Sequence, residues 1–199
     1  MEELTIGFAL TGSYCTFSQV IPEIENIKNY GYNIIPIMSE NVASTDTRFG
    51  KTIDFQEKIE SITNNKIIKK IKDAEPIGPK NILDALVIAP CTGNTLAKLS
   101  NGIADTSVTM ATKSTLRNNK PVIIAVSTND GLGNACKNIG NLLNYKNIYF
   151  VPFNQDNHKT KPRSLVADMT KIYNTLTCAL SGTQIQPIIY NNIEKNRNM

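Results

Sequence analysis

The 199-residue sequence has no tryptophan, a single histidine and only four cysteines. A protein zinc site needs closely spaced histidine or cysteine ligands, and the sequence has neither a CxxC pair nor a histidine cluster. The cysteines are scattered and no secretory leader is recognised, so a disulfide framework is not expected. They are Cys15, Cys91, Cys136 and Cys178. We therefore expect no metal site, and reduced thiols as in a cytoplasmic protein.

Long apolar runs are also missing, since no run approaches the roughly 20 residues that span a bilayer. The net charge is only +4, and the 41% hydrophobic and 19% charged fractions are typical of soluble globular proteins. The densest basic stretch, residues 66–72, has a helical pattern and is interpreted as a solvated helix face. Neither membrane nor nucleic-acid binding is expected.

Several familiar catalytic motifs are incomplete. Residues 7–13 follow a predicted strand but lack the Gly-Lys-Ser/Thr ending of a P-loop. Residues 131–136 begin like a GxGxxG motif, but Cys136 occupies the position of the third glycine. His158 lies in a polar segment away from every predicted strand end, so no serine or cysteine triad can be built. Cys15 and Cys91 lie beside loops expected to bind a ligand, and a packing role is favoured over nucleophilic catalysis for both.

Short apolar runs alternate with helical patterns along the whole chain. Strands are predicted at residues 4–10, 33–38, 84–89, 121–126 and 148–151, with Pro36 suggesting an edge strand. Helices are predicted at residues 17–30, 53–72, 94–101, 105–117, 132–142 and 165–180, with Asp105 as one N-cap and residues 39–50 irregular. The alternation predicts one α/β domain over residues 1–190, a doubly wound parallel sheet of the Rossmann or flavodoxin type in a three-layer sandwich. Residues 191–199 are predicted to be a flexible tail.

Small hydroxylated and amide residues follow four of the predicted strands. They are Thr11-Gly12-Ser13, Ser39-Glu40-Asn41, Thr92-Gly93-Asn94-Thr95 and Ser127-Thr128-Asn129. Each stretch alone is compatible with a turn or a helix N-cap. Because ligands of doubly wound sheets bind beyond the carboxyl ends of the strands, the four together predict an uncharged, donor-rich site for phosphate and polyol groups. A mononucleotide such as FMN fits this site better than a dinucleotide does.

The sequence of residues 90–105 resembles the signature of a known protein family. Pro90-Cys91-Thr92-Gly93-Asn94-Thr95, continuing through Asn101-Gly102-Ile103-Ala104-Asp105, resembles the PASANT signature of the homo-oligomeric flavin-containing cysteine decarboxylases. Residues 7–13 match the first phosphate loop of that family, and Ser39 matches its second-strand serine. Asn129 stands where the family carries the asparagine of a Pro-Ala-Met-Asn motif.

The resemblance implies FMN as cofactor and self-association into a trimer or dodecamer. It implies that FMN is bound by Thr11, Gly12, Ser13, Ser39, Thr92, Gly93, Asn94, Thr95 and Ser127. Asn129 is then expected near the flavin ring or a substrate carboxylate. Arg48 is a candidate for a second carboxylate, or else for a structural or intersubunit ion pair, because a guanidinium pairs with carboxylates in both roles.

Two departures separate the chain from the decarboxylases themselves. Residues 39–89 contain no histidine, where the decarboxylases use one, and residues 161–165 contain no glycine, where their substrate clamp is glycine-rich. Stretches such as GFALTGSYCT, STDTRFG, STNDGLG and VPFNQD instead resemble a sporulation branch of the family. The resemblance implies that the chain is one subunit of a two-subunit dehydrogenase. Its partner subunit would use NADP, and the enzyme would convert a dihydro-dicarboxylate into an aromatic dicarboxylate.

Three functions stay open at this point. The first is a cytoplasmic flavoprotein oxidoreductase subunit of that branch, whose catalytic acid or base the sequence does not identify. The second is a non-catalytic subunit that binds a partner or carries product. The third is an FMN-dependent decarboxylase in which another group replaces the missing histidine.

Overall fold

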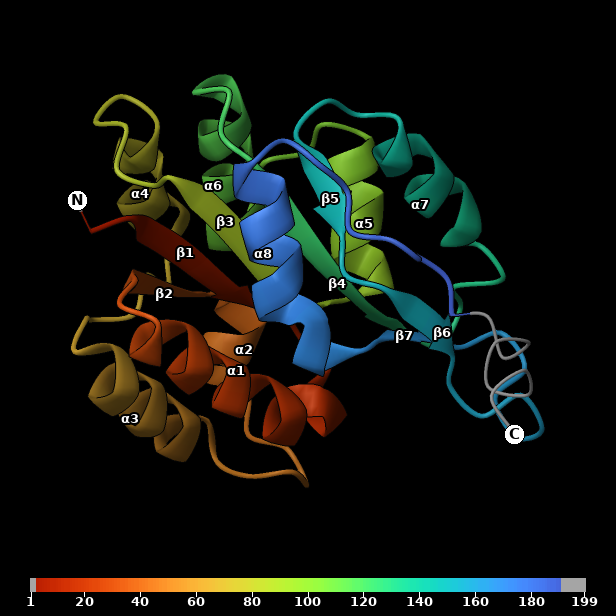
Figure 1. The fold of residues 1–199 in the computed structure, drawn as a ribbon. Coiled ribbons are helices and arrows are strands. Elements are labelled where there is room, and N and C mark those ends of the chain that lie inside the picture. Colours follow the sequence, from red (N-terminus) through yellow and green to blue (C-terminus); the bar gives the residue numbers. More distant parts are fainter. Residues whose placement is uncertain (1–2, 191–199) are drawn as a thin grey trace.

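The strands of the computed structural model, which describes residues 3–190, form one twisted sheet (Figure 1). The strands are β1 (Thr5–Leu10), β2 (Asn33–Met38), β3 (Ala85–Cys91), β4 (Val122–Thr128), β5 (Ile148–Phe150), β6 (Phe153–Gln155) and β7 (Leu165–Ala167). The parallel strands have the order β2-β1-β3-β4, with β5 beside the first half of β4. This flavodoxin-like order places the topological switch point between β1 and β3.

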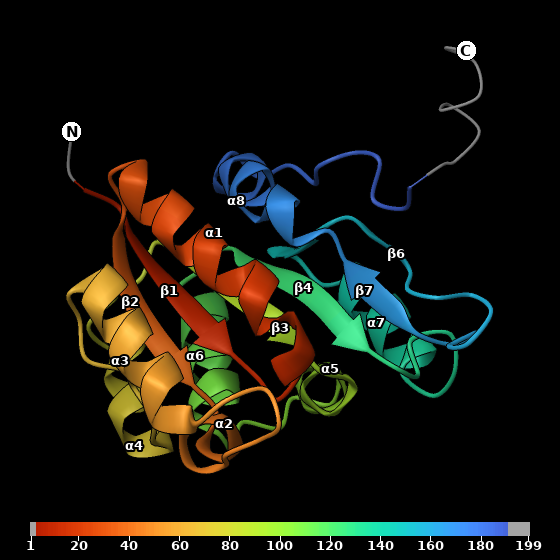
Figure 2. The ribbon, with the colours of Figure 1, turned by 90° about the horizontal axis from the view of Figure 1, so that it is seen from below.

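Helices cover both faces of the sheet, as the predicted three-layer α/β fold requires. The α-helices are α1 (Phe17–Asn29), α2 (Glu40–Ser44), α3 (Thr52–Thr63), α4 (Ile71–Ala74), α5 (Gly93–Ser100), α6 (Ser107–Arg117), α7 (Cys136–Leu143) and α8 (Ile172–Leu180). Short 3₁₀ turns are η1 (Tyr14–Thr16), η2 (Glu75–Ile77) and η3 (Met169–Lys171). In Figure 2, α1 and α8 lie on one face, while α5 and α6 lie on the other.

The central strands form the middle of the core because both of their faces are covered. Every residue of β3 is buried, as are five of the six residues of β1. Phe8, in the middle of β1, is completely buried. This explains why the sequence of these strands is continuously apolar instead of alternating.

Residues 66–70 are not helical, so the helix face predicted at residues 66–72 does not form; within this stretch only Ile71 and Lys72 are helical, at the start of α4. Helix α3 ends at Thr63, because Asn64 adopts a left-handed conformation with φ of 55°. The chain then runs beside the outer edge of β2, where Ile68 N–H donates to the Pro36 carbonyl at 2.9 Å. Proline has no N–H to donate to a neighbouring strand. Pro36 lies in β2, which is an edge strand of the sheet, as predicted.

The carboxyl-terminal part of the sheet is antiparallel, which the sequence analysis missed. Residues 165–167 form β7 and not the start of a helix, and β7 pairs antiparallel with the end of β4 and with β6. Helix α8 starts only at Ile172, and α7 starts at Cys136 instead of residue 132. Runs of three paired residues are too short for a periodic pattern to distinguish from helix.

Two further local predictions were wrong. Residues 40–44, expected to be irregular, form the short helix α2. Thr106, and not Asp105, is the N-cap of α6, where its hydroxyl and the Thr109 side chain form a reciprocal capping box. Asp105 instead pairs with Lys98 at 2.8 Å.

Within residues 3–190, no helix is both long and apolar enough to cross a membrane, and no group of three or more histidine, cysteine, aspartate or glutamate side chains is placed to hold a metal ion. All four cysteines are free. The predicted flexible tail at residues 191–199 lies outside the described residues.

Asp84 lies before β3, at the end of the sheet opposite the predicted site. Its carboxylate accepts hydrogen bonds from Thr5 N–H and from Lys120 Nζ, each at 3.0 Å. Partial burial acts to raise the pKa of Asp84, but these two hydrogen bonds and the Lys120 charge outweigh it, so that the pKa is lowered. The charged form therefore stabilises the fold above the unfolded-state pKa, and this contribution is lost as the pH falls through the folded-state pKa.

We expect Asp84→Asn to flatten the acid side of the stability profile, measured as the free energy of unfolding in urea between about pH 6 and pH 2. Asp73, an exposed residue of α4, provides the matched control Asp73→Asn, which should keep the wild-type profile. An unchanged acid limb in Asp84→Asn would show that the contacts with Thr5 and Lys120 do not lower the pKa of Asp84.

Candidate functional site

Two adjoining hollows lie where the carboxyl ends of β1, β2, β3 and β4 meet. The first has a volume of about 350 Å³ and the second about 640 Å³, and both are lined by Gly12, Thr92 and Asn94. The first is also lined by Thr11, Ser39, Glu40, Asn41, Thr95, Lys98 and Thr106. The second is also lined by Ser13, Tyr14, Cys15, Arg48, Phe49, Gly93, Ser127, Thr128, Asn129, Asp130, Asp156, Lys161, Ser164 and Val166. Volumes in this range suit small-molecule and cofactor ligands.

Threonine hydroxyls connect the ends of β1 and β3 in the first hollow. Thr11 Oγ1 donates to the Pro90 carbonyl at 2.7 Å and accepts from Thr92 N–H at 3.0 Å. Thr92 is the N-cap of α5, and its Oγ1 accepts from Thr95 N–H at 3.4 Å. These contacts fix the turn from β3 into α5 and hold the amino end of that helix toward the hollow. The helix dipole makes this a favourable place for an anion.

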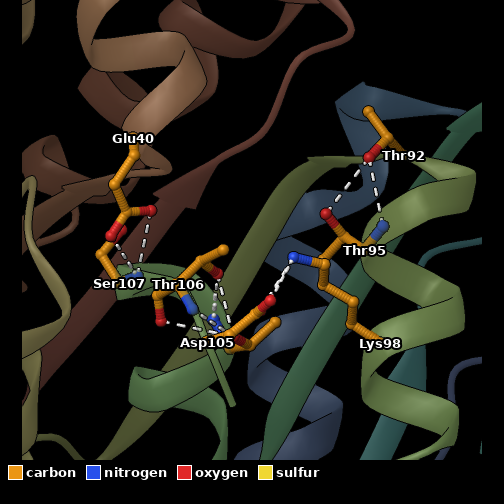
Figure 3. A network of polar contacts seen from close by, with 8 residues as sticks. Glu40, Thr92, Thr95, Lys98, Asp105, Thr106 and Ser107 are labelled. Carbon is orange, nitrogen blue, oxygen red and sulfur yellow. Dashed lines mark hydrogen bonds and ion pairs between the residues drawn. The ribbon is translucent and has the colours of Figure 1, made fainter. Parts of the chain in front are cut away.

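Both charged side chains of the first hollow already have a partner, Lys98 in an ion pair and Glu40 in hydrogen bonds, as Figure 3 shows. Lys98 Nζ lies 2.8 Å from both carboxylate oxygens of Asp105. The Glu40 carboxylate accepts from Ser107 N–H at the start of α6, at 3.0 and 3.3 Å. The remaining donors of this hollow are hydroxyls, the two side-chain amides of Asn41 and Asn94, and backbone N–H groups, which bind phosphate without adding a net charge.

The second hollow begins where the end of β1 meets the end of β4. Ser13 Oγ and Ser127 Oγ lie 2.7 Å apart, so that one hydroxyl donates to the other. Gly93 allows the β3 and β4 loops to approach closely, since a Cβ atom there would lie 2.7 Å from Thr128 Oγ1 and 2.8 Å from Asp130 Oδ1. A side chain at position 93 would therefore displace the side chains of Thr128 and Asp130.

Two cations line the second hollow from other parts of the chain. Arg48, between α2 and α3, has its guanidinium carbon 4.9 Å from the centre of the Phe49 ring and forms no ion pair with any residue from 3 to 190. Lys161, between β6 and β7, pairs with Asp156 at 2.8 Å. Of the roles considered for Arg48, an ion pair within the described chain is thus wrong, and a role toward a substrate or another subunit stays a prediction.

Each residue that the sequence analysis assigned to a cofactor or substrate lines one or both of these hollows. The structure therefore brings the predicted residues together, while their ligands stay predictions. Sequence reasoning missed Lys98 and Thr106 in the first hollow, and Asp130 and Asp156 in the second. Asp130 directly follows Asn129, so extending that strand-end motif by one residue would have found it.

The two cysteines near the site differ in environment. Cys91 is completely buried in β3, and burial raises the pKa of its thiol far above the ordinary value. Such a thiol is a poor nucleophile, in agreement with a packing role. Cys15 is exposed and lines the second hollow, with its sulfur 3.7 Å from Ser13 Oγ.

The chemistry of the donors fits a phosphorylated cofactor such as FMN. The first hollow offers hydroxyls and the amino end of α5 for a phosphate, and the second is larger, with apolar as well as polar walls. Gly12, between the two hollows, leaves open space, because a Cβ there would meet only the Tyr14 ring at 3.8 Å. A mononucleotide spanning both hollows would be contacted by all four strand ends.

A protein-family model described as Flavoprotein matches residues 1–175. The chain belongs to the flavoprotein family. The family resemblance inferred from the PASANT-like stretch is thereby confirmed.

Relatives of this flavoprotein place it within the family. It is 47% identical to the B subunit of dipicolinate synthase from Bacillus subtilis strain 168 over 191 residues, which cover 96% of each chain. The crystal structure of the corresponding B subunit from Bacillus halodurans is 45% identical, with a TM-score of 0.87 over 94% of this chain and 96% of that chain. By homology, this flavoprotein groups with the B subunits of dipicolinate synthase.

The FMN-binding protein AtHal3 shares the fold at lower identity. It is 17% identical, with a TM-score of 0.60 over 88% of this flavoprotein and 96% of AtHal3. The predicted α/β architecture, with a mostly parallel sheet between layers of helices, is thereby confirmed.

Proposed function

We propose that this chain is the B subunit of a dipicolinate synthase, acting in the dehydrogenation of dihydrodipicolinate to dipicolinate in the cytoplasm of a sporulating bacterium. The observation that carries the proposal is the 47% identity over nearly the whole length of a protein with that name. A second subunit, which uses NADP, is the proposed partner. The site described above is the proposed location of the chemistry.

We propose that FMN occupies both hollows of the site. The hydroxyls of Thr11, Ser39 and Thr95, with the amino end of α5, support a phosphate in the first hollow. Ser13 and Ser127 support the ribityl chain and the near edge of the ring. When bound, FMN would supply a two-electron acceptor, while the protein supplies position and electrostatics.

The dicarboxylate is proposed to bind in the second hollow. Asn129 offers an amide to one carboxylate, and Arg48, without an ion-pair partner in the described chain, offers a guanidinium to the other. No histidine lines either hollow, so cysteine decarboxylation is the less supported function.

FMN uptake tests the cofactor proposal directly. The purified chain is titrated with FMN while flavin fluorescence and visible absorption are recorded. We expect saturable quenching of the flavin fluorescence. A colourless preparation that takes up no FMN would reject the redox role and favour a non-catalytic subunit that binds product or the partner chain.

Arg48→Gln tests the substrate site. We expect the KM for dihydrodipicolinate to rise by about 10- to 100-fold in the complex with the partner subunit, because a charge-assisted pair with a carboxylate is lost. Arg117→Gln, in the last turn of α6 and outside both hollows, is the matched control and should leave KM unchanged. An unchanged KM together with a smaller oligomer would assign Arg48 to a subunit interface instead.

Self-association is the last part of the proposal. We expect light scattering to report a trimer or dodecamer, by analogy with the family. A single species at the monomer mass of 22.0 kDa would contradict this expectation.

A further inference from the structure

The second hollow contains two carboxylates, and they differ in their partners. Asp156 is paired with Lys161 at 2.8 Å. Asp130 forms no ion pair within residues 3–190. Asp130 is thus the carboxylate of this hollow whose charge no neighbouring cation neutralises.

The Asp130 side chain is held by Thr128, the last residue of β4, in space left by Gly93 at the start of α5. Thr128 Oγ1 donates to Asp130 Oδ1 at 2.5 Å. The same oxygen lies 2.8 Å from the position that a Cβ of Gly93 would take, so the missing side chain at the start of α5 makes room for it. The Asp130 carbonyl accepts from Gly133 N–H at 2.7 Å, which fixes the backbone at this position.

We propose that Asp130 is the proton acceptor in the dehydrogenation, an inference that rests on the proposed function. Oxidation of a dihydro ring dicarboxylate removes a hydride and a proton from adjacent ring atoms. One ring C–H bond breaks, and its electron pair leaves as hydride to a flavin or nicotinamide acceptor, which is reduced. The adjacent C–H bond breaks with its proton going to the Asp130 carboxylate, and its electron pair forms the new ring double bond.

The surroundings of Asp130 suit this role. The other charged and titratable side chains that line the hollow are Tyr14 and Cys15 from η1, Arg48 from the segment between α2 and α3, and Asp156 and Lys161 from the segment between β6 and β7. Arg163 lies beside Gly133, with its Nη1 3.7 Å from the position that a Cβ of Gly133 would take. With Arg48 and Asn129 engaged by the substrate carboxylates, Asp130 is the acceptor with no ion pair to break. A base within hydrogen-bond reach of the leaving proton contributes about 10²- to 10⁴-fold to a rate.

Asp130→Asn tests the inference in the complex of the full chain with its partner subunit. We expect kcat for dipicolinate formation to fall by about 100-fold or more, while KM stays within about twofold. FMN uptake should be unchanged. Asp73→Asn is the matched control on the surface and should behave as wild type.

Thr128→Val is a second variant, for the case that Asp130→Asn does not fold. It removes the hydroxyl that holds Asp130 Oδ1, and we expect kcat to fall by about tenfold while KM stays within about twofold. A purely structural role of the Thr128–Asp130 contact would instead lower the melting temperature and leave kcat unchanged. That result, or wild-type kcat in Asp130→Asn, would overturn the inference. A wild-type complex that forms no dipicolinate would overturn the proposed function and this inference with it, whereas loss confined to Asp130→Asn supports both.

Discussion

Asn94→Asp is expected to weaken FMN binding by about 100-fold without weakening the fold. Asn94 is the second residue of α5 and lines both hollows. A carboxylate there would lie beside the proposed phosphate, and like charges about 4 Å apart repel by about 4 kcal/mol at an effective dielectric constant of about 20. The same carboxylate interacts favourably with the helix dipole, so the melting temperature should stay constant or rise. Fluorescence titration with FMN and thermal unfolding measure the two effects.

The matched control is Asn174→Asp, which places the same charge in the first turn of α8, outside both hollows. Its FMN affinity should equal that of the wild type. Equal FMN affinities in Asn94→Asp and Asn174→Asp would show that the phosphate does not bind at the start of α5. Loss of affinity in both would point to the net charge of the protein.

Phe8→Ala is expected to lower the free energy of unfolding by about 3–5 kcal/mol. Phe8 is completely buried in the middle of β1, between helices on both faces of the sheet, and its removal leaves a cavity that the neighbouring strands cannot close. Since a domain of ordinary stability has only about 5–15 kcal/mol in total, the variant should lie close to unfolding at 37 °C. Urea denaturation measures the change.

Phe49→Ala provides the comparison for this prediction. The Phe49 side chain is 45% exposed, so we expect a loss below about 1 kcal/mol. Comparable losses at positions 8 and 49 would mean that β1 is not the centre of the core.

The sequence alone predicted the parallel half of the fold correctly. β1, β3 and β4 are buried on both faces, and this environment requires the continuous apolar runs from which they were predicted. The four hydroxylated strand ends could be predicted to meet because parallel strands in one sheet end at the same edge. The PASANT-like stretch indicated the family, and the comparisons with known proteins confirmed it.

Local patterns failed where tertiary contacts decide the structure. Residues 66–70 have a helical pattern, but pairing with the edge of β2 holds them extended. Residues 165–167 form a strand only because the end of β4 and β6 lie on either side of them. Runs this short carry too few residues for periodicity to identify them.

The sequence by itself thus determined the fold class, the family and the four strand ends that line the site, because these depend on patterns within single segments. Only the tertiary structure decided which charges face the site. The Thr128–Asp130 and Asp156–Lys161 contacts are local, but only the sheet brings Gly93 beside Asp130 and places Asp130 and Asp156 in one hollow. Which charged side chains share a hollow depends on which strand ends lie side by side in the sheet, and spacing along the chain does not encode that order.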